Sequence, residues 1–338
     1  MSSSAPETPA PPLLLDFWPR FLLFPVLAVV LYPPFVLGWG GDSLPVRAAW
    51  VAFLTFCWFC VGGAFHEAVH QTLFRQPWLN VWFGRILGIL TLIPYTSYRE
   101  THRWHHAYLN TPDDYELWPY SDPKSSLAFR RFFVWLDLLA GVLTGAYIYS
   151  RIYLVHEPRL KGETRRTIRG ELISIALFWI LFVAGLVAFT VARGFDWWQF
   201  DPVWLLPLLL APLFNTARKF VEHLGMTSHD PLLGTRTIVA GNVLSRLACF
   251  FNFDIAVHGP HHRYPRAQHY ELEGKLDAHR ASNPDVRIPV YGSYLTAAMD
   301  MLPSLWRNPA TGDHAAAAAH AQDGPKDFEV VETVSPSA

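Results

Sequence analysis

His102-Arg-Trp-His105-His106 places three imidazole side chains within five residues of a chain that is 338 residues long. The same His-x-x-His-His spacing returns in His258-Gly-Pro-His261-His262, and an earlier stretch, His66-Glu-Ala-Val-His70, holds two more histidines four residues apart. Eight of the fifteen histidines therefore lie in three short stretches, called the histidine boxes below, and His223 stands alone between the second and third. Each box lies near an apolar run, so boxes and runs have to be interpreted together.

The composition is that of an integral membrane protein. Hydrophobic residues make up 51% of the chain and charged residues 16%, and the mean hydropathy is +0.17. A soluble domain usually carries about 25% charged residues. The net charge of -1 gives no electrostatic reason to expect a nucleic-acid partner. Cys57 and Cys60 lie in an apolar run, where a thiol usually behaves as a small buried hydrophobe, so a redox role is not favoured.

The apolar runs predict four transmembrane helices, because a bilayer core needs about 20 apolar helical residues. These spans are expected at about 13–39, 48–65, 171–191 and 201–217. Residues 79–98 are apolar but contain Arg85, two glycines and a proline, so we expect an in-plane or re-entrant segment there. The aromatic stretch 130–154 is typical of an interfacial helix.

The whole chain is expected to be all-α, with one membrane domain at 13–309. Residues 1–12 are rich in Ser, Pro and Ala, and residues 310–338 are rich in Ala, so both ends are predicted to be disordered. The boxes and the polar segments around them should form a helical cap that carries two metals.

Charge placement predicts the orientation in the membrane. Thirteen Lys and Arg residues lie between the second and third predicted spans and eleven follow the fourth, whereas the two short turns carry only Arg47 and Arg193. Basic residues gather on the cytoplasmic side of membrane proteins. We therefore expect both termini and all histidine boxes on the cytoplasmic side.

The box spacings predict convergent imidazoles, since residues three and four apart share one face of a helix. The third box contains Gly259 and Pro260, so it is expected on a turn or in the first turn of a helix. Imidazole binds Zn, Cu, Fe and Ni. Together with His223 there are more candidates than one ion of four to six ligands can use, which favours two metals.

Two other interpretations remain open at this point. His66-Glu67-Ala-Val-His70 matches H-E-x-x-H, the helix of zinc proteases in which the glutamate is the general base. An intramembrane zinc protease would leave the other two boxes without a role. A metal-binding membrane protein without enzymatic activity is the third class. Four isolated histidines are interpreted as structural residues: His156, His229, His269 and His279.

The set HEAVH, HRWHH and HGPHH resembles the membrane fatty-acid desaturase family, which also includes hydroxylases and ketolases. The resemblance covers about residues 15–300 and includes His223 in Val-Glu-His-Leu-Gly-Met, and Asn110, Asp113 and Asp114 after the second box. It implies a non-haem centre of two iron ions, with O2 as co-substrate and no catalytic residues beyond the metal ligands. The implied ligands are His66, His70, His102, His105, His106, His223, His258, His261 and His262.

The resemblance further implies an oxidoreductase that introduces a double bond into a fatty-acyl lipid; a hydroxylase or ketolase with the same metals is the alternative. The chain contains no His-Pro-Gly-Gly stretch, so an external donor of the ferredoxin or cytochrome b5 type is expected. The third box begins with His258 rather than the Gln common in front-end desaturases, which argues against that subgroup.

One position departs from the family pattern. Some members carry Asn four residues before the isolated histidine, where this chain has Lys219, and the sequence offers no choice between Asn215 and Glu222 as a replacement. Imidazole ligands usually donate their second N–H to an acceptor that orients them. Candidate acceptors are Asp113, Asp114 and Glu222.

Overall fold

The computed structural model describes residues 18–194 and 201–316. This part is mostly helical, as predicted, and its only sheet among the described residues pairs two short parallel strands, Thr237 with Val290 and Ile238 with Tyr291. The elements are α1 (Trp18–Val30), α2 (Tyr32–Val36), α3 (Leu44–His70), α4 (Pro77–Thr91), α5 (Tyr95–Ala107), α6 (Leu127–Leu139), α7 (Gly141–Leu154), α8 (Gly162–Arg193), α9 (Leu206–His223), β1 (Thr237–Ile238), α10 (Val243–Phe251), α11 (His258–Arg263), α12 (Leu272–Ser282), β2 (Val290–Tyr291) and α13 (Tyr294–Arg307).

Two helices of the described part, α3 and α8, are long and apolar enough to cross a membrane. They contain the predicted spans 48–65 and 171–191. The pairs α4–α5 and α6–α7 are each bent, by 99° and 117°, and the number of crossings rises to four if each pair is one broken span. The predicted spans at 13–39 and 201–217 fall on α1–α2 and α9 and do not qualify singly, because α1 and α2 are separate short helices and α9 is less apolar. Residues 13–17 lie outside the described part.

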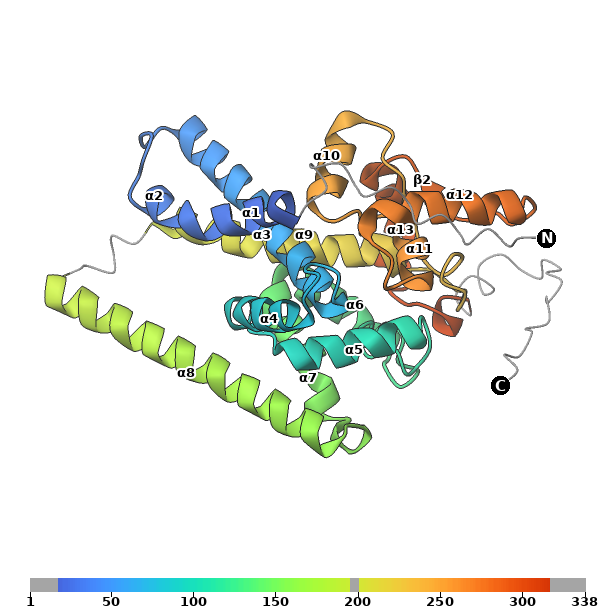
Figure 1. The fold of residues 1–338 in the computed structure, drawn as a ribbon, viewed down its shortest axis with the longest axis horizontal. Helices are drawn as coiled ribbons and strands as arrows, with labels where there is room; N and C mark the ends of the chain where they lie inside the picture. Colours follow the sequence, from blue (N-terminus) through green and yellow to red (C-terminus); the bar gives the residue numbers. More distant parts are fainter. Residues whose placement is uncertain (1–17, 195–200, 317–338) are drawn as a thin grey trace, which may run out of the picture.

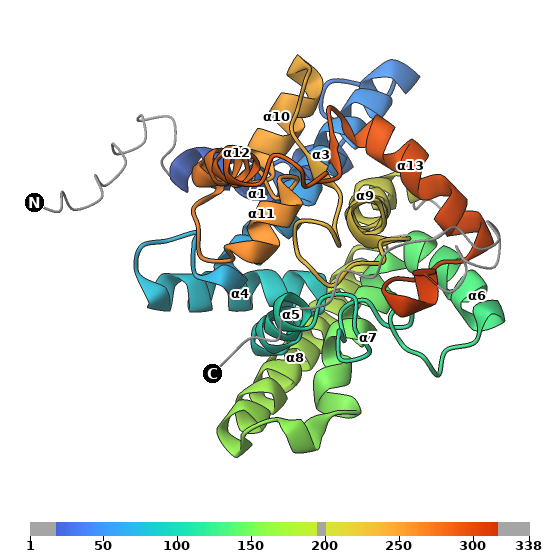
Figure 2. The same ribbon diagram turned by 90° about the vertical axis from the view of Figure 1, so that its right-hand side faces the viewer.

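Helix α3 is the centre of the fold, and α1 and α9 pack along it (Figure 1). A small residue permits the close approach of α9: a Cβ on Gly62 would lie 2.9 Å from Nδ2 and from Oδ1 of Asn215 on α9. Cys57, Ala64 and Ala68 of α3 are fully buried in the apolar core, which agrees with a packing role for the thiol. Seen along its axis, α9 lies between α3 and α13 (Figure 2).

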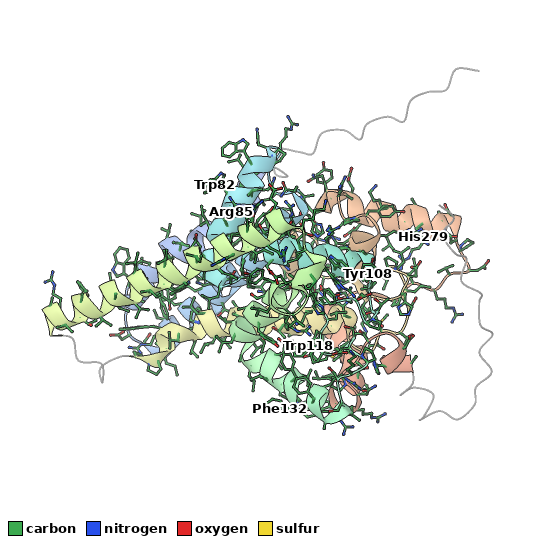
Figure 3. The ribbon with its side chains drawn as sticks, turned by 90° about the horizontal axis from the view of Figure 1, so that it is seen from below. Trp82, Arg85, Tyr108, Trp118, Phe132 and His279 are labelled. Carbon is green, nitrogen blue, oxygen red and sulfur yellow. The ribbon has the colours of Figure 1, made fainter. Side chains whose placement is uncertain are left out.

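Helix α8 contrasts with α3 in exposure: 6% of its apolar stretch is buried inside the protein, compared with 44% for α3. Its N-terminal half is held to α4 and α5: Glu171 accepts hydrogen bonds from Arg85 Nε at 2.9 Å and from the Thr96 amide at 2.8 Å. Arg85 lies beside α8 in the view of Figure 3. Further along, apolar side chains such as Ile180 and Leu181 are exposed. A bilayer accounts for this exposure, since lipid covers such side chains.

The C-terminal segment corrects one prediction. Residues 310–316 were expected to begin a disordered tail, but Ala310 is fully buried and its carbonyl accepts a hydrogen bond from the Gly225 amide. The Thr311 and Gly312 amides donate to the carbonyls of Tyr120 and Met226. Backbone hydrogen bonds of this kind need no apolar side-chain pattern, so no sequence pattern indicated the order at residues 310–316. The predicted disorder of residues 1–12 and 317–338 lies outside the described part.

Candidate metal centre

Four helices bring the nine sequence-predicted histidines to one place. The last turns of α3 carry His66 and His70, and the end of α5 carries the second box. Helix α9 ends at His223, and the short helix α11 is the third box itself. Gly259 and Pro260 lie in the first turn of α11, as predicted, where the missing N–H of a proline costs no hydrogen bond.

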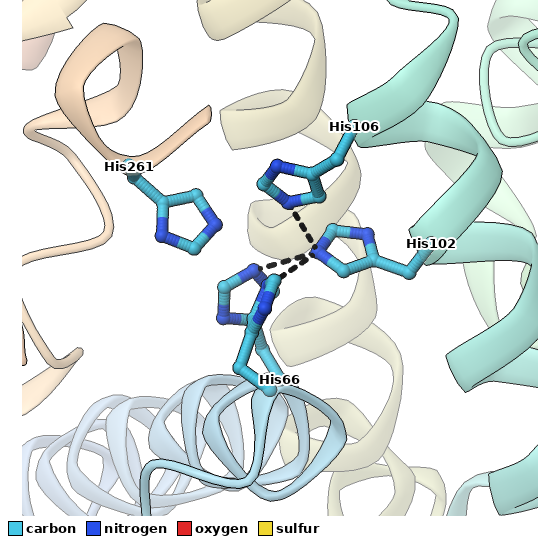
Figure 4. Close-up of side chains that lie close together, drawn as sticks. His66, His102, His106 and His261 are labelled. Atoms are coloured by element: carbon cyan, nitrogen blue, oxygen red, sulfur yellow. Dashed lines mark hydrogen bonds between the residues drawn. The ribbon is translucent and has the colours of Figure 1, made fainter. Parts of the chain in front are cut away.

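The imidazoles form two groups, and within each the potential ligand nitrogens lie within 4.8 Å of one another. The five-histidine group is His66, His70, His102, His106 and His261. The four-histidine group is His105, His223, His258 and His262. Figure 4 labels His66, His102, His106 and His261 of the five-histidine group, and its dashed lines meet at the His102 ring.

The His-x-x-His-His spacing explains how two boxes serve two groups. In α5, His102 and His106 are four residues apart and face the five-histidine group, while His105 faces the other. In α11 the division is reversed, since His258 and His262 join the four-histidine group and His261 crosses to the five. The second and third boxes therefore each supply two ligand candidates to one group and one to the other, which ties the groups together.

The short distances between ring nitrogens are those of a metal site. Nε2 of His102 lies 2.9 Å from Nε2 of His70 and 3.1 Å from those of His66 and His106. A single proton can be shared between only two of these nitrogens, so several lone pairs face each other without a donor. A cation between them removes this repulsion. The donor set thus fits bound metal ions, and all-nitrogen sites of this kind suit Fe, Zn, Cu or Ni.

Acceptors behind the rings fix which nitrogen faces the metal position. Nδ1 of His102 donates to Glu116 at 2.6 Å, and Nδ1 of His105 lies 2.9 Å from both carboxylate oxygens of Asp114. These bonds leave Nε2 as the ligand atom. Nδ1 of His258 lies 3.1 Å from the Ile255 carbonyl oxygen, which does the same with a backbone acceptor.

The pKa shifts differ among the box imidazoles: burial would lower the pKa of His105, but Asp114 and Glu116 outweigh it and raise that pKa. Burial and neighbouring imidazoles hold the pKa of His261 and of His262 well below the ordinary value, so these rings remain in the form that binds metal. Burial raises the pKa of Asp114, although the adjacent His105 opposes the shift. Burial would also raise the pKa of Glu116, but His102 and His105 outweigh it, and that pKa lies far below the ordinary value.

Of the three predicted orienting acids, only Asp114 makes a hydrogen bond to a box imidazole. Asp113 instead binds Arg159 at 2.8 Å on the surface. Glu222 lies 3.6 Å from Nε2 of His258, the nitrogen on the metal side, which is too long for a hydrogen bond. The missed partner is Glu116, fourteen residues after His102, and no local spacing rule connects the two.

Two further positions resolve open questions from the sequence. Lys219, at the position of the family's asparagine, forms an ion pair with Asp137 at 2.8 Å rather than facing a metal position. The Glu67 carboxylate is not placed as the base of a protease-like site. It accepts a hydrogen bond from Thr72 Oγ1 at 2.6 Å and lies 3.2 Å from Nδ1 of His66, the ring nitrogen that faces away from the metal position. A general base would have to face the metal position, so this geometry does not favour the protease interpretation.

The four histidines that were interpreted as structural all lie outside the two groups: His156, His229, His269 and His279. His156 stacks on Tyr115 with 4.0 Å between ring centroids, and Nδ1 of His269 lies 3.0 Å from Asp254. His279 lies far out on α12 (Figure 3).

An apolar cavity of about 680 Å³ opens beside the two groups and runs between the helices. His66, His102 and His258 border it at one end, and side chains such as Trp58 and Trp179 form its wall. Ligand cavities usually measure about 300–1,000 Å³, so this one has room for a lipid chain.

Comparison with known proteins agrees with this site. The family model described as fatty acid desaturase matches residues 42–293. The chain is 24% identical over 262 residues to the sn-1 oleoyl-lipid 12-desaturase of Arthrospira platensis, with 72% of each chain covered. It is 25% identical over 263 residues to the sn-1 acyl-lipid omega-3 desaturase (ferredoxin) of Synechocystis sp., covering 72% of this chain and 68% of the relative.

A third relative comes from a plant. The acyl-lipid omega-3 desaturase (cytochrome b5), endoplasmic reticulum, of Arabidopsis thaliana is 25% identical over 259 residues, covering 69% of this chain and 62% of the relative. The family match spans more than half of the chain and includes all three boxes. The protein therefore belongs to the fatty acid desaturase family and is an oxidoreductase that acts on lipids.

Proposed function

We propose that the protein is a membrane-bound acyl-lipid desaturase that introduces a carbon–carbon double bond with O2 at a centre of two iron ions. The observation that carries the proposal is the pair of imidazole groups at the end of an apolar cavity. The nine histidines of the two groups would hold the metals. The relatives, which are named as acyl-lipid desaturases, support the same reaction.

The reaction requires metal and oxygen chemistry, because an unactivated methylene carries no proton that a side-chain base can remove. Iron and O2, when bound, would supply hydrogen-atom abstraction from two neighbouring carbons. The balance is closed by two hydrogen atoms from the substrate, two electrons from a donor and two protons from solvent, so that one O2 becomes two waters.

The chain's own residues hold, orient and shield the reacting groups. Glu116 and Asp114 fix the His102 and His105 rings and place two negative charges behind neutral ligands. The apolar wall of the cavity excludes water and straightens the lipid chain, which keeps the reacting carbons beside the imidazoles. Water exclusion also strengthens the electrostatic interactions within the site.

The proposal extends to placement in the membrane. We expect the membrane domain at 13–309, with four crossings and with both termini and all boxes on the cytoplasmic side, because the basic residues flank the boxes. That side gives access to an external electron donor. One relative is named with ferredoxin and another with cytochrome b5, so either type suits the proposal.

Lipid profiling of a host that expresses the chain tests the reaction. Mass spectrometry should find acyl chains that have lost two hydrogens, and these should be missing with His261→Ala at equal membrane content. A hydroxylase would instead add one oxygen to the chain, and that result would replace the desaturase proposal. A zinc protease would bind about one zinc per chain and act without O2, so purified protein with two irons would exclude it.

A further inference from the structure

Arg218 lies on α9 one turn before Glu222, and it borders the apolar cavity beside the histidine groups. Its side chain is only 14% exposed. Its Nε and Nη1 atoms are buried without a hydrogen-bond partner among the residues that the structure describes. Glu222 lies 3.9 Å from Nη1, beyond hydrogen-bond reach, and 3.6 Å from Nε2 of His258. The guanidinium and the four-histidine group thus flank the same carboxylate.

Two other cations on or beside α9 have close partners. Lys219, the next residue, forms an ion pair with Asp137 at 2.8 Å. Arg236 donates to Asp300 at 2.6 Å and to two backbone carbonyls. The fold therefore supplies acceptors to its other cations near α9, and Arg218 is left short of them.

In the described part of the chain, Arg151 also has two buried nitrogens without a hydrogen-bond partner, but its charge is stabilised in another way. The guanidinium of Arg151 lies 3.9 Å from the centroid of the Trp118 ring, where a cation–π interaction stabilises the charge. Arg151 does not border the cavity. Arg218 differs in both respects.

A guanidinium with two buried nitrogens that lack an acceptor is strongly unfavourable, because arginine stays charged and carries five N–H donors. The metals that the histidine groups would hold add further positive charge nearby. Both effects favour an oxygen acceptor in the cavity at this point. Asn215, three residues earlier on α9, borders the same cavity, and its Oδ1 is also buried without a partner. The imidazole end of the cavity is thus polar on the α9 side, although its wall is otherwise largely apolar.

We infer that Arg218 is a substrate-positioning residue whose guanidinium donates hydrogen bonds to an oxygen atom of the lipid, beside the two histidine groups. The inference rests on the proposed function and names its substrate class, an acyl chain with an oxygen acceptor close to the reacting carbons. The acceptor is a carboxylate or carbonyl at the head of the chain, or a hydroxyl along it. The position of the double bond is then counted from that oxygen, while the hydrocarbon extends along the apolar wall.

Binding to the purified full-length protein, without O2 or electron donor, tests this without turnover. The probes are octadecane, octadecanoate, methyl octadecanoate and methyl 10-hydroxyoctadecanoate. Arg218→Met should lower the affinity for oxygen-bearing probes about 10- to 100-fold and leave octadecane unchanged. Loss for octadecanoate and its methyl ester assigns the oxygen to the head, whereas loss confined to the hydroxy ester assigns it to the chain. If Arg218→Met binds each of the four probes as tightly as the wild type does, the inference is overturned.

A stability measurement separates positioning from a structural role. Arg218→Met removes a guanidinium whose Nε and Nη1 make no hydrogen bond but which lies 3.9 Å from the buried Glu222, so its Tm should fall less than that of Arg236→Met, which loses hydrogen bonds to Asp300 and to two carbonyls. A Tm of Arg218→Met as low as that of Arg236→Met, together with wild-type binding of the probes by Arg218→Lys, would indicate that the positive charge only stabilises the fold. That result also counts against positioning. Lipid profiling of the host is read separately: absence of desaturated product with intact Arg218-dependent binding defeats the proposed function alone. Desaturated product with unaltered binding by Arg218→Met defeats this inference alone.

Discussion

The two histidine groups differ in how firmly their rings are held. In the five-histidine group, Glu116 and Glu67 contact the outer nitrogens of His102 and His66. In the four-histidine group, Asp114 holds His105 with both oxygens. His258 is held by the Ile255 carbonyl, but the other two rings are less well anchored, because the outer Nδ1 atoms of His223 and His262 are buried without a partner in the described part of the chain.

This difference predicts that the two groups respond unequally to the loss of one histidine. A metal in the five-histidine group keeps four ligands when one is lost, which is still a complete set for a tetrahedral ion. A metal in the four-histidine group falls to three ligands, and two of its original four rings have no hydrogen bond behind them. The groups should therefore separate when metal content and turnover are measured together.

The largest effect is expected from removing one ligand candidate from each group. His258→Ala should abolish turnover and reduce the metal content from about two ions to about one per chain, because three ligands remain in its group. His106→Ala should also abolish turnover but retain more metal. Elemental analysis of the two purified variants, with product formation in the host, provides the measurement. Equal metal loss in both variants would contradict the unequal groups.

A smaller effect is expected from the orienting carboxylates. Asp114→Asn and Glu116→Gln keep a hydrogen-bond acceptor but remove the negative charge, so each should lower metal affinity or turnover by about 10- to 100-fold. Asp114 should cost more, since it contacts its ring with both oxygens at 2.9 Å. Competition with a chelator measures the affinity. A greater loss for Glu116→Gln would reverse the ranking of the two groups.

The sequence indicated which histidines converge, because that information is local. Three- and four-residue spacings on a helix determine which rings converge, and α5 and α11 divide their histidines by that rule. The partner of His102 was missed because Glu116 reaches it through the turns after α5, a path that no spacing describes. Asp113 and Asp114 are neighbours of one type, and only the course of the chain decides which of them faces inward.

The fold was predictable to the same extent. Long apolar runs identified α3 and α8, since hydropathy alone determines such helices. The division of the first run into α1 and α2 and the ordered segment 310–316 depend on prolines and on backbone hydrogen bonds to distant residues. Neither leaves a periodic pattern. The cavity and its polar corner at Arg218 depend on the packing of α9 against its neighbours, which no local pattern describes.

A third prediction addresses the position of α11, which serves both groups. A Cβ on Gly259 would lie 2.9 Å from Oγ1 of Thr237 and 3.2 Å from Cα of Leu232, so part of the obstruction is backbone. Gly259→Ala should destabilise the protein by about 1–3 kcal/mol and displace two rings of the four-histidine group but one of the other. Gly170→Ala on α8, where nothing lies within 4 Å, is the matched control and should leave the Tm unchanged or raised. Equal Tm values for the two alanine variants would show that α11 can shift freely.

The smallest effect is expected at Asp113, the neighbour of Asp114. Its carboxylate binds Arg159 at 2.8 Å, but both side chains are nearly half exposed, at 45% and 48%. Exposed ion pairs contribute about 0–1 kcal/mol, so Asp113→Asn should change the Tm little and leave metal content and turnover as in the wild type. The same chemical change one residue later removes the charge that anchors His105. Asp113→Asn and Asp114→Asn, measured side by side, separate two effects. One is the loss of the hydrogen bond that anchors His105, and the other is the loss of an acidic charge from this loop. A comparable loss of metal in Asp113→Asn would mean that the charge of the whole loop, rather than the hydrogen bond to the ring, stabilises that group.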